Sequence, residues 1–114
     1  MFFVLVPELV RFQAKSFHNA GSKFKLLCYL VKGTKPFEFE WLKNQAKVTN
    51  DGFKYKIETE DDESQFTILK LDPNDTGNYS CHVRNDFGDD TQYTFLFVQG
   101  LTFWNFVFVT KCGA

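Results

Sequence analysis

Residues 71–81 read Leu-Asp-Pro-Asn-Asp-Thr-Gly-Asn-Tyr-Ser-Cys and carry the most specific fold pattern in the chain. The Asp-Pro-Asn-Asp segment has the composition of a tight turn. After it, Tyr79 and Cys81 alternate with polar residues, which is the period of a half-buried strand. A tyrosine two residues before an inward-facing cysteine can return its hydroxyl to the backbone of the preceding turn. Asp75 can accept hydrogen bonds within that turn or a salt bridge from the lysines at 54–56.

The same alternation predicts that Cys28 and Trp41 also point inward, each from a strand of its own. Two facing sheets lie about 10 Å apart, a gap that a disulfide can bridge while an indole packs against the sulfurs. A bridge between Cys28 and Cys81 closes a long loop, which stabilises a fold by about 4 kcal/mol in the chain-entropy model.

Further runs with period two surround these landmarks, and no stretch has a sustained helical period. Turn-forming residues separate the runs at intervals of about 8–12 residues, which is typical of a β-sandwich or a barrel. The cysteine geometry favours the sandwich, so we predict an all-β fold of two antiparallel sheets. Its expected inward residues include Phe24, Leu26 and Leu30, then Phe37 and Phe39, then Phe66, Ile68 and Leu71, and finally Val83.

Composition and charge narrow the class of protein. The chain has 114 residues, of which 44% are hydrophobic and 15 are Phe, and its net charge is -1. These values fit one soluble, strand-rich domain and lack the basic excess of a nucleic-acid-binding module. His18 and His82 have no second ligand at metal spacing, and no catalytic or phosphate-binding motif is present. We therefore expect no metal, no cofactor and no enzymatic activity.

Two apolar ends flank the predicted domain, which covers 7–100. Residues 1–6 resemble the apolar core of a signal peptide without its charged start, length or cleavage site. They are either a remnant of such a signal or leading strand residues. Residues 101–114 form a hydrophobic tail that is too short to span a bilayer, and a truncated or read-through end of a longer chain explains it. Cys112 belongs to this tail, which leaves Cys28 and Cys81 as the structural pair.

The landmark residues together resemble an immunoglobulin domain, and the resemblance covers 7–100. It rests on Cys28, Trp41, Phe66-x-Ile68, Leu71 and Asp75-x-Gly77-x-Tyr79-x-Cys81. The short stretch between Trp41 and Phe66 leaves room for strands C, C′ and D but hardly for C″, as in the intermediate set. The residues between these landmarks, such as Thr76-Gly77-Asn78-Tyr79-Ser80-Cys81, are similar to the sequences of Dscam-type adhesion receptors of arthropods. Gln45 departs from the pattern, because such domains usually carry a turn glycine there.

The resemblance implies an extracellular or cell-surface binding module of an adhesion or immune-type receptor, with neighbouring immunoglobulin domains in a longer parent chain. Its partner is a protein, and Dscam-type receptors bind copies of themselves. Two other interpretations stay open: a structural spacer domain of a muscle or cytoskeletal protein, and the ligand-binding domain of a growth-factor-type receptor.

The outward face of the strands expected at 37–42, 78–84 and 93–98 is the candidate interface. Family spacing places the aromatic side chains of the last of these strands in solvent, next to polar residues of the strand at 78–84. The alternative is that the tail or a neighbouring domain covers these rings. The candidate interface residues are Tyr93, Phe95, Phe97, His82 and Arg84.

Other polar features have weaker functional interpretations. Asn78 and Asn74 begin N-glycosylation acceptor patterns, or else are ordinary polar turn residues. Asn78 is expected to point outward, since its neighbour Tyr79 points inward. The acidic residues 60–63 form either a weak site for a cation or basic partner or, as a charge run normally does, a solvated loop.

Overall fold

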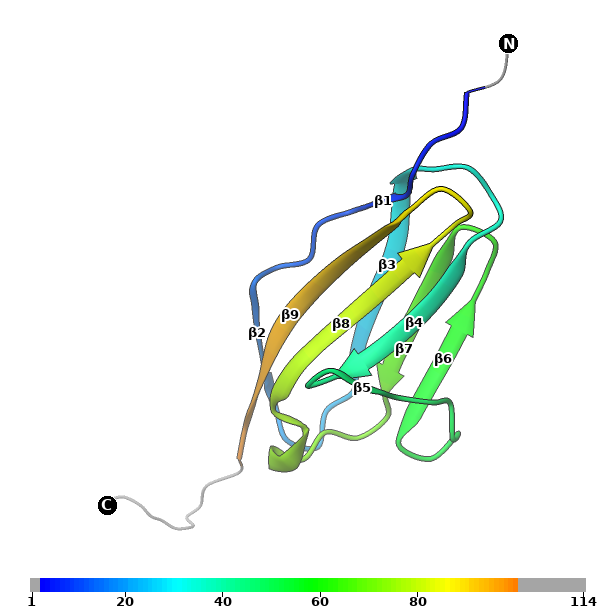
Figure 1. Ribbon diagram of the computed structural model, residues 1–114. Coiled ribbons are helices and arrows are strands. Elements are labelled where there is room, and N and C mark those ends of the chain that lie inside the picture. Colours follow the sequence, from blue (N-terminus) through cyan, green and yellow to red (C-terminus); the bar gives the residue numbers. More distant parts are fainter. Residues whose placement is uncertain (1–2, 101–114) are drawn as a thin grey trace.

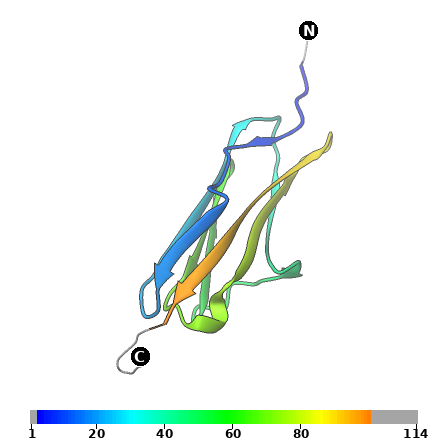
Figure 2. The same ribbon diagram turned by 90° about the vertical axis from the view of Figure 1, so that its left-hand side faces the viewer.

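The computed structural model describes residues 3–100, whose strands form two sheets packed face to face (Figure 1; Figure 2). A four-stranded sheet has the order β1-β3-β7-β6, and a five-stranded sheet has the order β2-β9-β8-β4-β5. The predicted all-β sandwich is confirmed. The strands are β1 Glu8–Leu9, β2 Lys15–Asn19, β3 Phe24–Lys32, β4 Glu38–Lys43, β5 Ala46–Lys47, β6 Tyr55–Thr59, β7 Glu63–Ile68, β8 Gly77–Arg84 and β9 Asp89–Gln99, with a 3-10 turn η1 at Pro73–Asp75.

One strand pair differs from the prediction of two antiparallel sheets. β2 runs parallel to β9, with Lys15 opposite Phe95 and Asn19 opposite Gln99. The first segment of the chain pairs with β3 through β1 and then crosses to the edge of the other sheet as β2. The crossing lets one segment supply an edge strand to each sheet, so the short β1 and β2 take the edge positions in place of the longer β3 and β9. The five-stranded sheet is therefore mixed.

A disulfide and a tryptophan occupy the centre of the core. Cys28 of β3 and Cys81 of β8 are bonded across the two sheets and are fully buried. Trp41 of β4 is buried beside them, opposite Cys81 in the strand register. Its indole N–H donates to the Ser64 hydroxyl of β7 at 2.8 Å, which satisfies the buried donor. Stacking of Phe66 on Trp41, with ring centroids 5.2 Å apart, extends the core toward β6.

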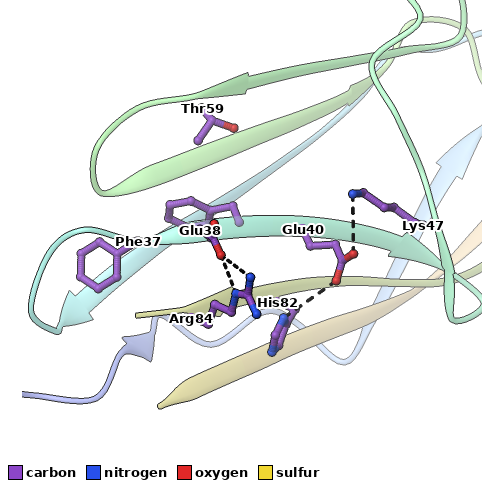
Figure 3. Close-up of a pocket in the computed structure, with 8 residues that line it drawn as sticks. Phe37, Glu38, Glu40, Lys47, Thr59, His82 and Arg84 are labelled. Carbon is purple, nitrogen blue, oxygen red and sulfur yellow. Dashed lines mark hydrogen bonds and ion pairs between the residues drawn. The ribbon is translucent and has the colours of Figure 1, made fainter. Parts of the chain in front are cut away.

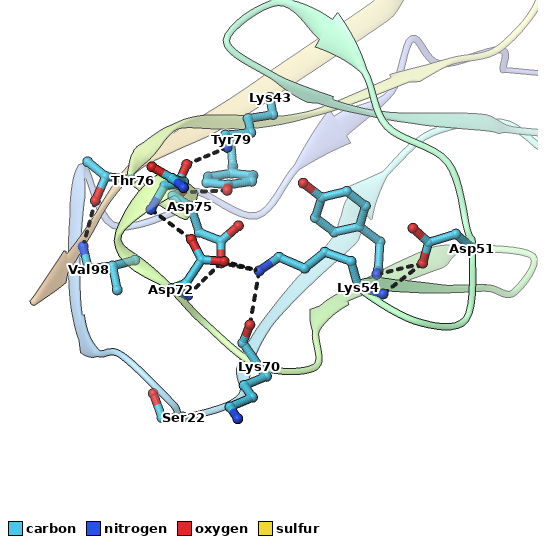
Figure 4. A network of polar contacts seen from close by, with 12 residues as sticks. Ser22, Lys43, Asp51, Lys54, Lys70, Asp72, Asp75, Thr76, Tyr79 and Val98 are labelled. Carbon is cyan, nitrogen blue, oxygen red and sulfur yellow. Dashed lines mark hydrogen bonds and ion pairs between the residues drawn. The ribbon is translucent and has the colours of Figure 1, made fainter. Parts of the chain in front are cut away.

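A polar network closes the lower end of the sandwich, around residues 71–81 (Figure 4). The Tyr79 hydroxyl donates to the Asp75 carbonyl at 2.6 Å, and burial raises the pKa of this phenol. The Asp75 carboxylate accepts from the Asp72 N–H at 2.8 Å and from the Lys54 ammonium at 2.6 Å. Asp75 thus accepts both a turn hydrogen bond and a salt bridge. The salt bridge comes from Lys54, whereas Lys56 pairs with Glu58.

The hairpin between β4 and β5 uses two residues with left-handed backbone, Asn44 at φ 50° and Gln45 at φ 72°. Asn44 is held there because it donates its N–H to the Asn78 carbonyl and accepts the Asn78 N–H on its side chain. The same side chain explains Gly77, since a Cβ at that position would lie 3.0 Å from the Asn44 amide. Gln45 occupies a conformation that favours glycine, in line with the departure seen in the sequence.

The first described residues contact the domain. Leu5 and Thr34 exchange two hydrogen bonds, and the Asn85 side chain donates to the Leu5 carbonyl at 2.7 Å. The division into 1–6, 7–100 and 101–114 stays a prediction, and Phe103, Phe106, Phe108 and Cys112 lie outside the described residues. Within residues 3–100, no helix has the length and apolar character that a membrane span requires.

Candidate protein-binding face

The last strand turns a row of aromatic rings outward. Along β9 the even-numbered Thr94 and Leu96 are buried, so the odd-numbered side chains project from the five-stranded sheet. Tyr93 is 60% exposed, Phe95 37% and Phe97 36%. The Phe95 and Phe97 rings contact each other with centroids 4.7 Å apart. The structure therefore places all three predicted aromatic residues on one surface.

Phe17 of β2 belongs to the same surface, although sequence reasoning did not single it out. It is 56% exposed and stacks on Phe97 with ring centroids 4.9 Å apart and an angle of 16° between the rings. The parallel pairing of β2 with β9 brings these two residues opposite each other. We call Phe17, Tyr93, Phe95 and Phe97 the aromatic patch.

The remainder of this face carries charge. Arg84 of β8 forms an ion pair with Glu38 of β4 (Figure 3). The His82 Nε2 atom lies within hydrogen-bond distance of the Asp89 carboxylate, at 2.8 Å, and the Nδ1 atom lies 4.0 Å from the Glu40 carboxylate. His82 and Arg84 thus lie on the predicted face, yet both are already paired with carboxylates. Charged side chains occupy the upper end of the sheet and aromatic ones the lower end.

Two small polar residues lie between these ends. Ser80 belongs to the same face of β8 as His82 but is only 6% exposed, because its cross-strand neighbours Leu42 and Tyr93 are larger and flank it. Asn78 is half-buried and lies opposite Phe95 in the β8–β9 register. Asn74 is exposed in η1, where its carbonyl accepts from the Lys43 ammonium at 2.8 Å.

The other polar features lie away from this face. The acidic residues 60–63 form the turn between β6 and β7, where the Glu60 N–H donates to the Glu63 carbonyl and Asp61 lies 3.9 Å from the Lys35 ammonium. The His18 ring packs edge-on against Phe24. In the described part of the chain, no three His, Cys, Asp or Glu side chains are grouped as a metal ion would need.

A sandwich of four and five strands, with a disulfide between the sheets and a tyrosine bonded back to its turn, defines an immunoglobulin-like domain. The chain belongs to the Immunoglobulin I-set domain family, which matches residues 7–98.

Relatives in sequence and in structure share this domain. The chain is 35% identical over 71 residues to chicken Protein sidekick-1 and 30% identical over 80 residues to the Cell adhesion molecule Dscam2 of Drosophila melanogaster. These matches cover 62% and 65% of the chain but only 3% and 4% of the relatives. The chain therefore spans a small part of their length.

Among solved structures, the I-band fragment I67-I69 from titin superposes with a TM-score of 0.75 at 25% identity, covering 86% of this chain and 34% of that one. The Dscam1 Ig7 domain, isoform 5, superposes with a TM-score of 0.76 at 20% identity, covering 82% and 97%. The second likeness shows the fold alone. Related domains thus occur both in an adhesion molecule and in titin.

Proposed function

We propose that this chain is an extracellular immunoglobulin-like binding module of a cell-adhesion or immune-type receptor, and that it acts by binding protein, without a chemical step. The observation that carries the proposal is the aromatic patch on the five-stranded sheet. Large rings clustered at the centre of a contact with charged residues at its rim are the composition of protein interfaces. The relation to the Cell adhesion molecule Dscam2 supports the same class of function.

The partner that we propose is a second copy of the chain. Two copies related by a twofold axis can bury the same patch on each side, as isologous dimers do. Phe17 and Phe97 are already stacked, and so are restrained before contact, which lowers the entropy lost on binding. The ion pairs at the other end of the face leave it polar in the absence of a partner.

Sedimentation velocity of the full chain over a range of concentrations tests this partner. We expect a monomer–dimer equilibrium that Phe95→Asp or Phe97→Asp weakens at least about tenfold, because a charge would be buried in an apolar contact. Phe53→Asp is the matched control, since Phe53 is 89% exposed in the loop between β5 and β6. A wild-type chain that stays monomeric, or equal association of the Phe95→Asp variant, would exclude a homophilic contact through the patch.

The extracellular location rests on the disulfide, because such bonds persist in oxidising compartments and are rare in the cytosol. The relation to titin favours a second candidate function, a structural spacer domain. The thiol state of Cys28 and Cys81 in protein taken from native tissue separates the two functions. An oxidised pair agrees with the adhesion module, whereas free thiols there would favour the spacer and remove support for the extracellular location.

A glycan on Asn78 would compete with the proposed contact. Asn78 lies directly opposite Phe95 on the same face, so a sugar attached to its side chain would lie over the patch. An interface and an occupied acceptor cannot share this position. Intact-mass analysis of protein secreted from eukaryotic cells, with Asn78→Gln and Asn74→Gln variants, shows which acceptor carries a glycan. Full occupancy of Asn78 would overturn the proposed contact through Phe95.

A further inference from the structure

The edge of the five-stranded sheet beyond β4 is covered along only part of its length. β5 pairs only with Leu42 and Lys43, and one more bond joins the Val48 N–H to the Trp41 carbonyl. The chain then leaves the sheet because the Asp51 carboxylate accepts three backbone N–H groups, which fixes a turn leading to β6. Among the described residues, no strand pairs with β4 at Glu38–Glu40 on this side.

The register shows which backbone groups the open edge presents. The Asn44 N–H donates to the Asn78 carbonyl, so these two residues form a hydrogen-bonded pair at the end of the β4–β8 ladder. In an antiparallel ladder, hydrogen-bonded pairs alternate with non-hydrogen-bonded pairs. Every second residue before Asn44, including Glu40 and Glu38, therefore exchanges backbone hydrogen bonds with β8, whereas Phe39 does not. The N–H and the carbonyl of Phe39 therefore point away from β8, toward the open edge. The bond from the Val48 N–H to the Trp41 carbonyl agrees with this assignment, because Trp41 lies two residues after Phe39 and presents its carbonyl to the same edge.

A groove runs along this edge. It has a volume of about 520 Å³ and extends from the end of β6 across β4 to β8 (Figure 3). Phe37 and Phe39 supply apolar lining from the β4 side, and Thr59 lines it from β6. His82 and Arg84 line it from β8 on the outer face. A strand added to β4 would lie about 4.8 Å from it, so its inward side chains would enter the groove.

Charges along the sheet define what such a strand must carry. In the strand register Asp89 lies opposite Arg84, and Arg84 lies opposite Glu38, so the signs alternate across three strands. Opposite charges on neighbouring strands stabilise a sheet, so the next strand fits best with a basic residue beside Glu38. Lys47 of β5, which lies opposite Leu42, illustrates this preference, since its ammonium lies 3.9 Å from the Glu40 carboxylate.

The same charges disfavour a second copy at this edge. Antiparallel pairing of two β4 edges can place Phe39 opposite Phe37, Phe39 or Trp41 of the other copy. The three registers set Glu38 against Glu38, Glu38 against Glu40, and Glu40 against Glu40, respectively. Like charges directly opposite are destabilising. The edge is therefore better suited to a different partner than to itself.

We propose that the open edge of β4 binds an extended segment of another protein by strand addition, with basic residues opposite Glu38 and Glu40 and an apolar residue opposite Phe39. The added strand runs antiparallel to β4 and continues the line of β5 past Val48. The residue between its two basic residues exchanges two backbone hydrogen bonds with Phe39, and its basic side chains extend the alternating charges on the outer face. This contact is separate from the aromatic patch.

Nuclear magnetic resonance titration of the full chain with the peptide acetyl-KVKVT-amide tests the proposal. Its first residue lies opposite Glu40 and its first valine opposite Phe39, so the peptide ends before the positions on β4 that Lys47 and Val48 already occupy. We expect the Phe39 amide to shift and to become protected from hydrogen exchange, because it gains a hydrogen-bond acceptor. N-methylation of the valine between the two lysines removes the donor that faces Phe39 and should abolish binding. N-methylation of either lysine, whose amides point away from β4, should leave binding intact and is the matched control.

Charge variants test the specificity. The Glu-containing peptide acetyl-EVEVT-amide should bind about tenfold more weakly, and Glu38→Gln should weaken the lysine peptide about threefold. Glu58→Gln, an exposed change on β6, should have no effect. The proposal is overturned by the absence of a Phe39 shift at about 1 mM peptide, by shifts confined to the aromatic patch, by equal binding of the two N-methylated forms, or by equal binding of the acidic peptide.

Discussion

Replacing Lys54 with methionine is expected to lower the free energy of unfolding by about 3 kcal/mol. The Lys54 ammonium lies 2.6 Å from the Asp75 carboxylate, whose side chain is 4% exposed, and 3.0 Å from the Asp72 carboxylate and the Lys70 carbonyl. At an effective dielectric constant of about 20, two unit charges 2.6 Å apart attract by roughly 6 kcal/mol. Most of this attraction offsets the cost of removing the two charges from water. Removing one partner of a buried pair costs about 3–5 kcal/mol. Since Lys54 is 30% exposed, we expect the lower end.

The loss should depend on pH. Burial lowers the pKa of Lys54, but its hydrogen bonds to Asp75 and Asp72 outweigh that effect and the pKa is raised above 10.5. In the wild type, this contribution is therefore fully present below pH 10.5 and is lost as the pH rises through the raised pKa. The Lys54→Met variant lacks this contribution at every pH. The difference between the two proteins should therefore narrow as the pH rises above about 10.5, where the wild type loses its ammonium charge.

Urea unfolding followed by circular dichroism measures both effects without adding salt. Lys56→Met is the matched control, because Lys56 lies two residues further along the chain, in β6, and forms only an exposed pair with Glu58 at 3.8 Å, worth about 0–1 kcal/mol. The double variant Lys54→Met/Asp75→Asn should recover part of the loss. The reasoning fails if the two methionine variants differ by less than about 1 kcal/mol, or if the deficit of Lys54→Met does not change with pH.

Three further predictions concern stability. Replacing Cys28 and Cys81 with alanine should cost about 4 kcal/mol in urea unfolding, since the unfolded chain regains the entropy of an open loop; a loss below about 1 kcal/mol would contradict this. Gln45→Gly should raise the melting temperature, with a gain of about 0.5–1 kcal/mol, because φ is 72° there, whereas Gln45→Ala should not. The pKa of Asp51 is lowered because it accepts backbone N–H groups, that of Tyr55 foremost. Its contribution should be full above pH 3.8 and be lost as the pH falls through the lowered pKa, and Asp51→Asn should flatten the acid end of the stability profile.

Much of the fold could be predicted because its landmarks are local patterns. Alternation fixed the inward side of Phe24, Phe66 and Val83, and turn residues separated the strands. The parallel pairing of β2 with β9 could not be predicted, since no turn joins segments from opposite ends of the chain and β2 is short. Such a pairing depends on which edge is open after the other strands have assembled.

The candidate site was only partly predictable for the same reason. Family spacing indicated which side of the last strand faces the core, and period two then placed Tyr93, Phe95 and Phe97 outside. Phe17 was missed because its partner Phe97 is brought to it by the parallel register, which the sequence does not display. The sequence also could not show that Arg84 is engaged by Glu38, since that pairing depends on how β4 aligns with β8.

The two proposed contacts use different chemical groups of the same sheet, and this makes them separable by experiment. The aromatic patch acts through side chains of β2 and β9, so Phe95→Asp removes it without changing the backbone of β4. The open edge acts through the N–H and carbonyl of Phe39, which no side-chain change on β9 alters. Because β8 lies between β9 and β4 in the sheet, a partner strand at the edge leaves the patch free. Peptide binding by the Phe95→Asp variant should therefore equal that of the wild type, while dimerisation should be unchanged in Glu38→Gln.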